Sequence, residues 1–528
     1  MNKWWLIIIT LIALSLRLAY INYPPLLWDE ASIGYNAYSL IHTARDEYGQ
    51  LLPLIFKSFG DYKPGLYIYL ATPFIALFGL NTLALRLPSI ILGSLLPLLL
   101  YLVVKKLSPH HKLLPLFCAI LLAFNPWNIH FSRGAWETNV MLFELLLGTY
   151  LFISKKFTFA SIILALSFYT YQGGKLFAPL LLLILVFSFY QTLDKKKYLQ
   201  LILPFVIISL PLIYGLITQN DSNRLNVFAL WNYHRPAADS QQITIESSNL
   251  NYSVFHHELI FFTRNFLTRY FNYFSFRFLT FEGDWQITRH SAPYIGVLLY
   301  PSIFFFFLGL VRTQLQKYSK LDIIFSLWLL TAPLLGALTR DIIQPVRTLP
   351  LSIPLIYFTA VGIIFALEKI PRKFIFYFNF FLLTLYSLSL VTYLELYYQH
   401  MVKVNPSHWL FGYQSAIQYV IANQTGKTVT FTDFYGQPYI YYLYYSQYPP
   451  LKYQSQAKLI SSGIDTGRIT QIDNLKFEVP NFNSQKNLPH QLLILSHDDA
   501  LRQGIDMKVL TPLSPINGYS TFYAYQTN

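Results

Sequence analysis

Long apolar runs separated by lysine and arginine clusters constrain this chain more than any other feature. They recur from residue 4 to about residue 396, and many reach roughly 17–20 residues, the length that an α-helix needs to cross a bilayer. Charged residues make up only 12% of the chain, about half the fraction that is typical of soluble proteins. The sequence therefore predicts a polytopic α-helical membrane protein.

The basic clusters predict the topology. Pairs of apolar runs separate successive clusters, such as Lys105-Lys106, Lys155-Lys156 and Lys195–Lys197, so every cluster can lie on the inner side. This arrangement gives about eleven transmembrane helices, with the N-terminus inside and the C-terminus outside. The expected spans cover about residues 4–20, 88–104, 113–129, 138–154, 157–171, 177–191, 198–217, 293–311, 321–338, 348–367 and 374–396.

One apolar run, residues 66–79, is left out of that count. It is short for a span, and counting it would place the next three basic clusters outside. We therefore expect residues 21–87 to form one external loop with interfacial helices, and residues 218–292 to form a second large external loop. Candidate site residues then face outward from the cell (plasma) membrane.

The tail, residues 399–528, differs in character from residues 1–398, the transmembrane domain. Strands are expected at residues 427–432 and 491–496, and helices at 409–423 and 498–503. Residues 507–509 and 522–525 are expected to supply edge strands. The pattern predicts a small extracytoplasmic α/β domain.

Cysteine content and charge exclude two classes of protein. Cys118 is the sole cysteine of the chain, which leaves no disulfide framework and no thiolate metal site. The net charge of +14 is distributed over span ends, where membrane topology explains it better than nucleic-acid binding does.

Acidic residues gather just after the first apolar run. Asp29 and Glu30 follow Trp28, and Asp61 and Lys63 lie some thirty residues further on. Carboxylates are costly near a bilayer and are usually functional there. Three further acidic residues are interpreted separately: Asp46-Glu47 is read as a solvated loop, with cation binding as the weaker alternative, and Glu144 is read as a functional residue or a helix–helix hydrogen-bond partner.

Three short motifs then occur in a characteristic order. They are Asp29-Glu30, Lys63-Pro64-Gly65-Leu66 and Arg86-Leu87-Pro88-Ser89, and Phe131-Ser132-Arg133 extends the set. In this order the chain resembles the GT-C glycosyltransferases that use polyprenyl-phosphate sugars, nearest the protein O-mannosyltransferases and the lipid A aminoarabinose transferases. Phe281–Asp284 with Arg289–Ser291 is similar to a late external loop of bacterial relatives. Gly65 departs from the second proline of the family motif, and the acidic residue usually found just before the lysine is displaced to Asp61.

The resemblance implies a division of labour among these residues. Asp29 is expected to be the general base and Glu30 to orient it, while Lys63, Arg347 and Arg340 are expected to bind the donor phosphate. A helix cap for Asp29 and lipid-headgroup contacts for the cations are the alternatives. Further site candidates are Asp61, Arg86, Arg133 and Glu137.

The implied activity is transfer of a hexose, with mannose preferred, from a polyprenyl-phosphate sugar to an acceptor hydroxyl outside the membrane, with inversion. Expected partners are the lipid-linked donor, membrane lipids, and an acceptor that is a protein, a lipid or a cell-envelope glycan. No metal site is assigned, and a divalent cation is left open. A lipid-linked sugar transporter is the alternative from another class, but the charges cluster at one surface and no internal repeat appears.

Overall fold

The computed structural model describes residues 4–218, 230, 237–246, 249–316, 318–461 and 467–527. The chain divides into two compact units. The first unit, here the helical unit, comprises Met1–Leu16, Leu92–Ser132 and Thr138–Leu396. The second, here the site unit, comprises Arg17–Ile91, Arg133–Glu137 and Tyr397–Asn528. Three stretches of the predicted large external loop, residues 219–229, 231–236 and 247–248, fall outside the described residues.

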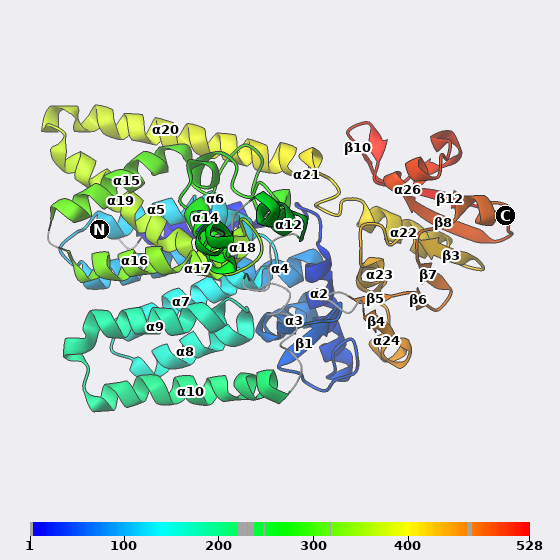
Figure 1. Cartoon of the computed structure of the whole chain (residues 1–528), viewed down its shortest axis with the longest axis horizontal. Helices are drawn as coiled ribbons and strands as arrows, with labels where there is room; N and C mark the ends of the chain where they lie inside the picture. Colours follow the sequence, from blue (N-terminus) through cyan, green and yellow to red (C-terminus); the bar gives the residue numbers. More distant parts are fainter. Residues whose placement is uncertain are drawn as a thin grey trace. The chain divides into compact units, whose positions relative to one another are not determined.

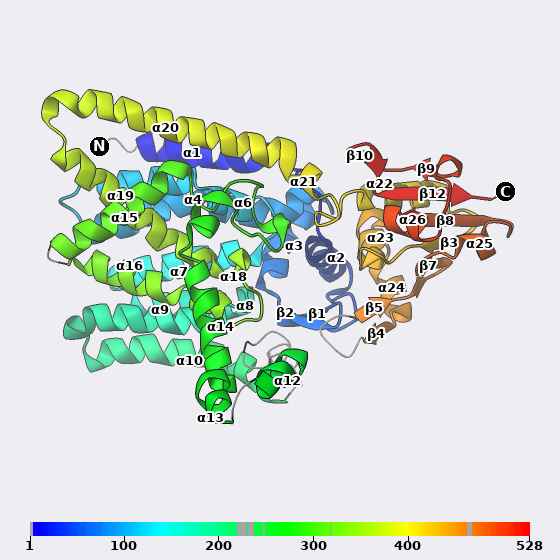
Figure 2. The ribbon, with the colours of Figure 1, turned by 45° about the horizontal axis from the view of Figure 1, so that its top comes forward.

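A helix stands at each of the eleven expected positions. Long helices run side by side in the helical unit, for example α8, α9 and α10 (Figures 1 and 2). The helices at these positions are α1 (Trp4–Leu18), α4 (Thr82–Leu107), α5 (Leu114–Ala123) with α6 (Pro126–Ser132), α7 (Glu137–Ile153), α8 (Phe157–Thr170), α9 (Gly174–Phe189), α10 (Lys195–Thr218), α15 (Tyr300–Leu315), α16 (Lys320–Thr331), α19 (Ser352–Lys369) and α20 (Ile375–Glu395).

Length and composition alone support fewer spans than the charge pattern does. Among the described residues, five helical segments are long and apolar enough to cross a bilayer, or six if α5 and α6, which meet at 54°, form one broken span. The count of eleven therefore stays a prediction. Helix α4 begins at Thr82, before the expected residue 88, because the Asn81 side chain accepts a hydrogen bond from the Ala84 backbone N–H (2.9 Å) and starts the helix earlier.

Two glycines let α15 and α19 approach closely. A Cβ at Gly309 would lie 1.9 Å from the carbonyl oxygen of Phe358, and a Cβ at Gly362 would lie 1.9 Å from that of Phe305. Small residues at such crossings allow backbone contact between helices in a bilayer. Helices α15 and α19 therefore pack backbone against backbone within the helical unit.

In the site unit, helix α2 (Trp28–Thr43) packs against α3 (Leu66–Phe78). Strands β1 (Ile55–Ser58) and β2 (Asp61–Pro64) form an antiparallel hairpin. The hairpin lies between α2 and α3 in the sequence. The two-residue turn, Phe59-Gly60, has φ values of +56° and +89°. Positive φ at both turn residues matches the twist of the strands, so the turn sets the hairpin register.

The tail forms a mixed sheet with helices on both faces. Its strand order is β6-β7-β3-β8-β12-β9, and β3 pairs in parallel with both β7 and β8. One face packs on α22 through Tyr413, and the other packs on α25 and α26 through Phe482 and Ala500. The strands are β3 (Thr428–Phe431), β6 (Gln471–Ile472), β7 (Leu475–Phe477), β8 (Gln491–Ser496), β9 (Thr511–Pro512) and β12 (Phe522–Gln526). The helices are α22 (Tyr413–Asn423), α23 (Pro438–Ser446), α24 (Pro450–Gln456), α25 (Phe482–Gln485) and α26 (His497–Arg502).

Two details of the tail differ from the sequence-based expectation. Met507–Val509 is a 3₁₀ turn, not a strand, because Asp506 caps it by accepting a hydrogen bond from the Lys508 backbone N–H (3.0 Å). Strand β12 lies inside the sheet, since β9 covers its outer edge. The tail also groups with residues 17–91, so the domain boundary near residue 398 stays a prediction.

Candidate active site

The site unit joins Asp29 and Lys63 in an ion pair between the Asp29 Oδ1 and the Lys63 Nζ atoms. The other oxygen, Oδ2, accepts a hydrogen bond from the Trp28 indole N–H (3.1 Å). Asp29 lies in the first turn of α2, where the positive end of the helix dipole stabilises a carboxylate. The Asp29 side chain keeps 39% exposure, so a substrate can reach it.

The hairpin register aims Lys63 at Asp29. Lys63 lies opposite Phe56 and next to Ser58 on one face of the hairpin, whereas Lys57 lies opposite Tyr62 on the other face. The Lys63 ammonium also lies 5.3 Å from the centre of the Phe59 ring. Two nearby lysines therefore have different environments.

Gly65 is required by this hairpin. A Cβ there would lie 2.4 Å from the Phe56 ring, and the Gly65 backbone N–H donates to the Leu54 carbonyl (3.1 Å). A proline would lose this hydrogen bond and collide with the ring. The departure from the family motif thus has a local steric cause.

A small pocket brings a third predicted residue to the pair. Asp29, Lys63 and Glu137 line it together with side chains of α2, the hairpin and α3. Its space of about 10 Å³ is of the order of one water molecule. A reacting group larger than a water molecule would therefore have to lie next to the Asp29–Lys63 pair, outside this pocket.

Glu30 is part of an anchor. Arg86 donates two hydrogen bonds to its carboxylate, from Nε (2.8 Å) and Nη2 (2.7 Å). The backbone N–H groups of Leu27 (3.2 Å) and Ala135 (2.8 Å) donate to the same carboxylate. The Arg86 guanidinium also donates to the carbonyl of Ile21 (2.7 Å). These contacts hold the start of α2, and direct catalytic roles for Glu30 and Arg86 stay predictions.

Arg133 is a second buried anchor. Its guanidinium donates to the carbonyls of Arg17 (3.2 Å) and Tyr23 (3.0 Å) and to the Tyr397 hydroxyl (3.2 Å). It thereby ties the segment before α2 to the segment before the tail. Asp61, at the hairpin turn, accepts a hydrogen bond from the Tyr62 backbone N–H (2.8 Å), and its role at the site stays a prediction.

The interpretation of Asp46-Glu47 as a solvated loop is wrong. Both side chains are buried, at 1% and 0% exposure. Glu47 Oε1 accepts from the amide of Asn36 (3.2 Å) and from the hydroxyl of Ser32 (3.5 Å). Burial raises the pKa of Glu47 to about 8, although the Asn36 hydrogen bond opposes the shift. Glu47 is connected to the pocket through Ser32 and Asn36, which line it and donate hydrogen bonds to its carboxyl group, and the raised pKa favours the protonated form near neutral pH.

The sequence did contain a signal for this network. Polar residues recur on α2 at three- and four-residue spacing, which places them on one face of the helix. They are Asp29, Ser32, Asn36, Ser39 and Thr43. This stripe would have singled out the side of α2 that faces the pocket and Glu47.

Arg347 and Arg340 belong to the helical unit. Arg347, in the short helix α18 (Pro345–Thr348), donates to the Asp341 carboxylate (2.7 Å) and the Thr339 hydroxyl (2.6 Å). The backbone carbonyl of Arg340 accepts from the Arg269 guanidinium (2.9 Å). Phosphate binding by either arginine stays a prediction.

A buried Asp–His pair lies in the same unit. His290 Nδ1 and Asp284 Oδ2 are 2.7 Å apart, and burial lowers the pKa of His290 while the Asp284 hydrogen bond opposes the shift. Among the described residues, no three His, Cys, Asp or Glu side chains form a group that could hold a metal ion.

Glu144 of α7 accepts a hydrogen bond from the Thr170 hydroxyl of α8 (2.8 Å), so it makes the helix–helix hydrogen bond that was one of the two interpretations from the sequence.

Comparison with known proteins finds one matching family model, over part of the chain. The family model described as dolichyl-phosphate-mannose-protein mannosyltransferase matches residues 7–169, a stretch that includes all the site residues predicted in the first 140 positions. No curated protein matches the sequence significantly.

Solved structures show the same fold over the whole chain. The crystal structure of ArnT from Cupriavidus metallidurans in the apo state superposes with a TM-score of 0.56 at 12% identity, covering 99% of this chain and 98% of that chain. The same protein bound to undecaprenyl phosphate gives 0.54 at 12% identity, with 99% and 98% covered. The chain has a GT-C fold, and together with the family match the likeness indicates a glycosyltransferase.

Proposed function

We propose that this protein transfers a hexose, with mannose the first candidate, from a polyprenyl-phosphate donor to an acceptor hydroxyl on the outer side of the cell membrane. The observation that carries the proposal is the Asp29–Lys63 pair beside a pocket that Glu137 also lines. The family match to dolichyl-phosphate-mannose users and the undecaprenyl phosphate bound by ArnT support the donor class.

The pair suits both halves of the reaction. The acceptor oxygen attacks the anomeric carbon, and the bond from that carbon to the phosphate oxygen breaks. The configuration at the anomeric carbon is inverted. Asp29 takes the acceptor proton as general base. The leaving phosphate keeps the electron pair and gains one negative charge, which Lys63 neutralises.

Donor binding also activates the base in this scheme. In the resting site, Lys63 and Asp29 neutralise each other. A donor phosphate that draws Lys63 away leaves the Asp29 carboxylate free to accept a proton. The prediction that Arg347 binds phosphate rests on its chemistry, since a guanidinium binds phosphate oxygens in a bidentate manner.

The test uses the purified full-length protein in lipid nanodiscs with a panel of polyprenyl-phosphate sugars. Release of polyprenyl phosphate, followed by mass spectrometry, needs no knowledge of the acceptor because water can serve slowly in its place. We expect Asp29→Asn to lower turnover at least about a hundredfold, with Asp506→Asn, an exposed tail residue, as the control. Near-normal turnover in Asp29→Asn would remove Asp29 from catalysis, and no turnover of any donor would favour the transporter.

A further inference from the structure

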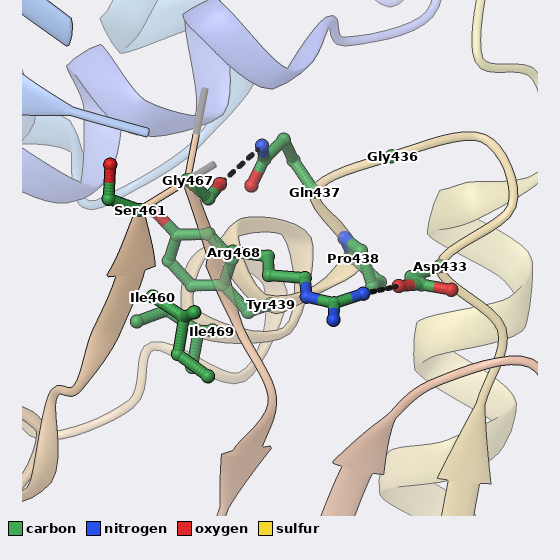
Figure 3. A pocket seen from close by; sticks show the side chains of 10 residues that line it. All are labelled: Asp433, Gly436, Gln437, Pro438, Tyr439, Ile460, Ser461, Gly467, Arg468 and Ile469. Atoms are coloured by element: carbon green, nitrogen blue, oxygen red, sulfur yellow. Dashed lines mark hydrogen bonds and ion pairs between the residues drawn. The ribbon is translucent and has the colours of Figure 1, made fainter. Parts of the chain in front are cut away.

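A larger pocket of about 390 Å³ lies in the tail part of the site unit, within the range of roughly 300–1,000 Å³ that is usual for ligand sites. Its walls come from the segment between β3 and α23 and from the strands β4 (Leu459–Ser461) and β5 (Gly467–Ile469). Figure 3 shows the side chains that line it. None of them was singled out by the sequence.

The pocket has the position that α/β sheets give to ligand sites. Asp433 follows the carboxyl end of β3, which is parallel to both of its neighbours. Ligands of open α/β sheets bind beyond the carboxyl ends of parallel strands. Gln437, which precedes α23, has φ +48°, and strained backbone of this kind clusters at functional sites.

The polar lining retains unused hydrogen-bonding capacity. The Arg468 Nη1 and Asp433 Oδ2 atoms are 3.7 Å apart, too far for a direct hydrogen bond. Burial raises the pKa of Asp433. The Gln437 amide N–H donates to the Gly467 carbonyl (2.9 Å), and its buried Oε1 has no hydrogen-bond partner within the described part of the chain.

The remaining lining is apolar and partly aromatic. In Figure 3 Ile460 and Ile469 lie near the Tyr439 ring, and the Arg468 guanidinium extends away from them toward Asp433. A sugar ring offers the matching chemistry, because its hydroxyls bond to planar polar side chains and its C–H faces pack on apolar and aromatic surface. An extended peptide would instead need unpaired backbone along a strand edge.

The wall of the pocket continues to the candidate active site. A Cβ at Gly436 would lie 2.8 Å from the Trp28 ring, and Tyr439 packs on Phe59 with the ring centres 6.1 Å apart. The Trp28 indole N–H donates a hydrogen bond to Asp29, and the Lys63 ammonium lies over the Phe59 ring. A molecule held in the pocket is thus separated from the ion pair by these two rings.

We propose that this pocket is an acceptor subsite that binds a sugar residue of a glycan acceptor, with Arg468, Asp433 and Gln437 bonding its hydroxyls. The proposal rests on the function proposed above and assigns its acceptor class. A second sugar residue of the acceptor then extends past Trp28 and Phe59 and presents its hydroxyl to Asp29.

The experiment measures initial rates of the full-length protein in nanodiscs, with the donor that it turns over. The probes are four disaccharides (maltose, cellobiose, chitobiose and α-1,2-mannobiose) and a serine- and threonine-rich octapeptide. Arg468→Ala and Asp433→Asn are compared with Lys452→Ala, which breaks another partly exposed ion pair of the tail (2.6 Å to Asp473). Donor hydrolysis without acceptor is followed in parallel.

We expect at least one disaccharide to be glycosylated and both pocket variants to raise its KM about tenfold or more, as loss of a hydrogen bond to a charged group does. The donor KM, donor hydrolysis and the Lys452→Ala variant should remain within about twofold of the unaltered protein. Saturable use of the peptide with no disaccharide accepted, or an unchanged KM in both variants, would overturn the acceptor assignment while leaving the transferase intact. Absence of donor hydrolysis in the unaltered protein would instead refute the proposed function, and the subsite with it.

Discussion

The charge balance around Asp29 sets the chemistry of this site. Lys63 satisfies the carboxylate in the resting state, and its side chain retains 17% exposure, so both groups remain within reach of a substrate. The attraction between them is strong at the short range of an ion pair, and a phosphate must compete with it. Donor binding and activation of the base are therefore coupled through one lysine.

Lys63 and Lys57 offer a matched comparison for this coupling. We expect Lys63→Ala to lower kcat and raise the donor KM, because the leaving phosphate gains charge in the transition state. Lys57→Ala should have a mild effect, since Lys57 lies on the opposite face of the hairpin above Tyr48. The measurement is the dependence of the initial rate on donor concentration. Equally mild effects would show that both lysines contact lipid headgroups and that the phosphate is held elsewhere.

Glu47 predicts a dependence of stability on pH. Its pKa is about 8 in the folded protein and about 4.3 in an unfolded chain, so the folded state binds the proton more tightly. The stabilisation is fully present below about pH 4 and is lost as pH rises toward about 8. We expect Glu47→Gln to reduce the fall of Tm between pH 5 and pH 8. Exposed Glu478→Gln should keep the fall, and an equal fall in both variants would contradict a buried protonated Glu47.

Among the elements, the hairpin and α3 decide whether the site lies at one surface. Helix α3 has 13 residues and a length of about 20 Å, well short of a bilayer core of about 30 Å. Helices α1 and α8, which are expected to be spans, are also short, so length alone does not distinguish α3 from a transmembrane helix. The basic clusters do, because a crossing by α3 would reverse the side of Lys105-Lys106 and the clusters that follow.

Cysteine labelling tests the placement of α3. In a Cys118→Ser background, we expect an impermeant thiol reagent to label Tyr62→Cys and Thr82→Cys in intact cells. It should label His110→Cys, at an exposed position after α4, only after permeabilisation. Labelling of position 110 in intact cells would overturn the topology, and the outward orientation of the site with it.

For the whole molecule, periodicity and charge predicted the helices but not the contacts between distant segments. Motif order singled out Asp29, Lys63 and Arg86; the structure pairs Asp29 with Lys63 and Arg86 with Glu30, and their roles in the reaction stay predictions. Glu47 was misread because Asp46-Glu47 was judged as an isolated acidic pair, although Asn36 of the polar stripe on α2 binds its carboxylate. The tail pocket was missed because Asp433 and Arg468 meet only after β3 and β5 have folded into place.

The tail also proves to be part of the structure that holds α2. The Tyr441 hydroxyl donates to the Leu26 carbonyl (3.0 Å), and Gln454 donates to the Ser39 hydroxyl (3.1 Å). A Cβ at Gly34 would lie 2.6 Å from the Tyr444 ring, which shows how closely the two segments pack. The helix that begins with Asp29 is thus covered by residues some four hundred positions later.

A cleavable variant tests this dependence. A protease site inserted between Asn405 and Pro406 allows the connection to be cut after folding. We expect the cut tail to remain bound during gel filtration in high salt, because it contacts α2 and the residues just before it through uncharged hydrogen bonds and ring contacts such as that of Tyr35 with Tyr453, whereas salt screens only charges. Gly34→Leu should weaken retention by wedging the Tyr444 ring away, whereas Tyr441→Phe, which keeps the ring, should retain the tail. Release of the tail from the unaltered sequence, with donor hydrolysis preserved, would show that α2 and the Asp29–Lys63 pair stand without it.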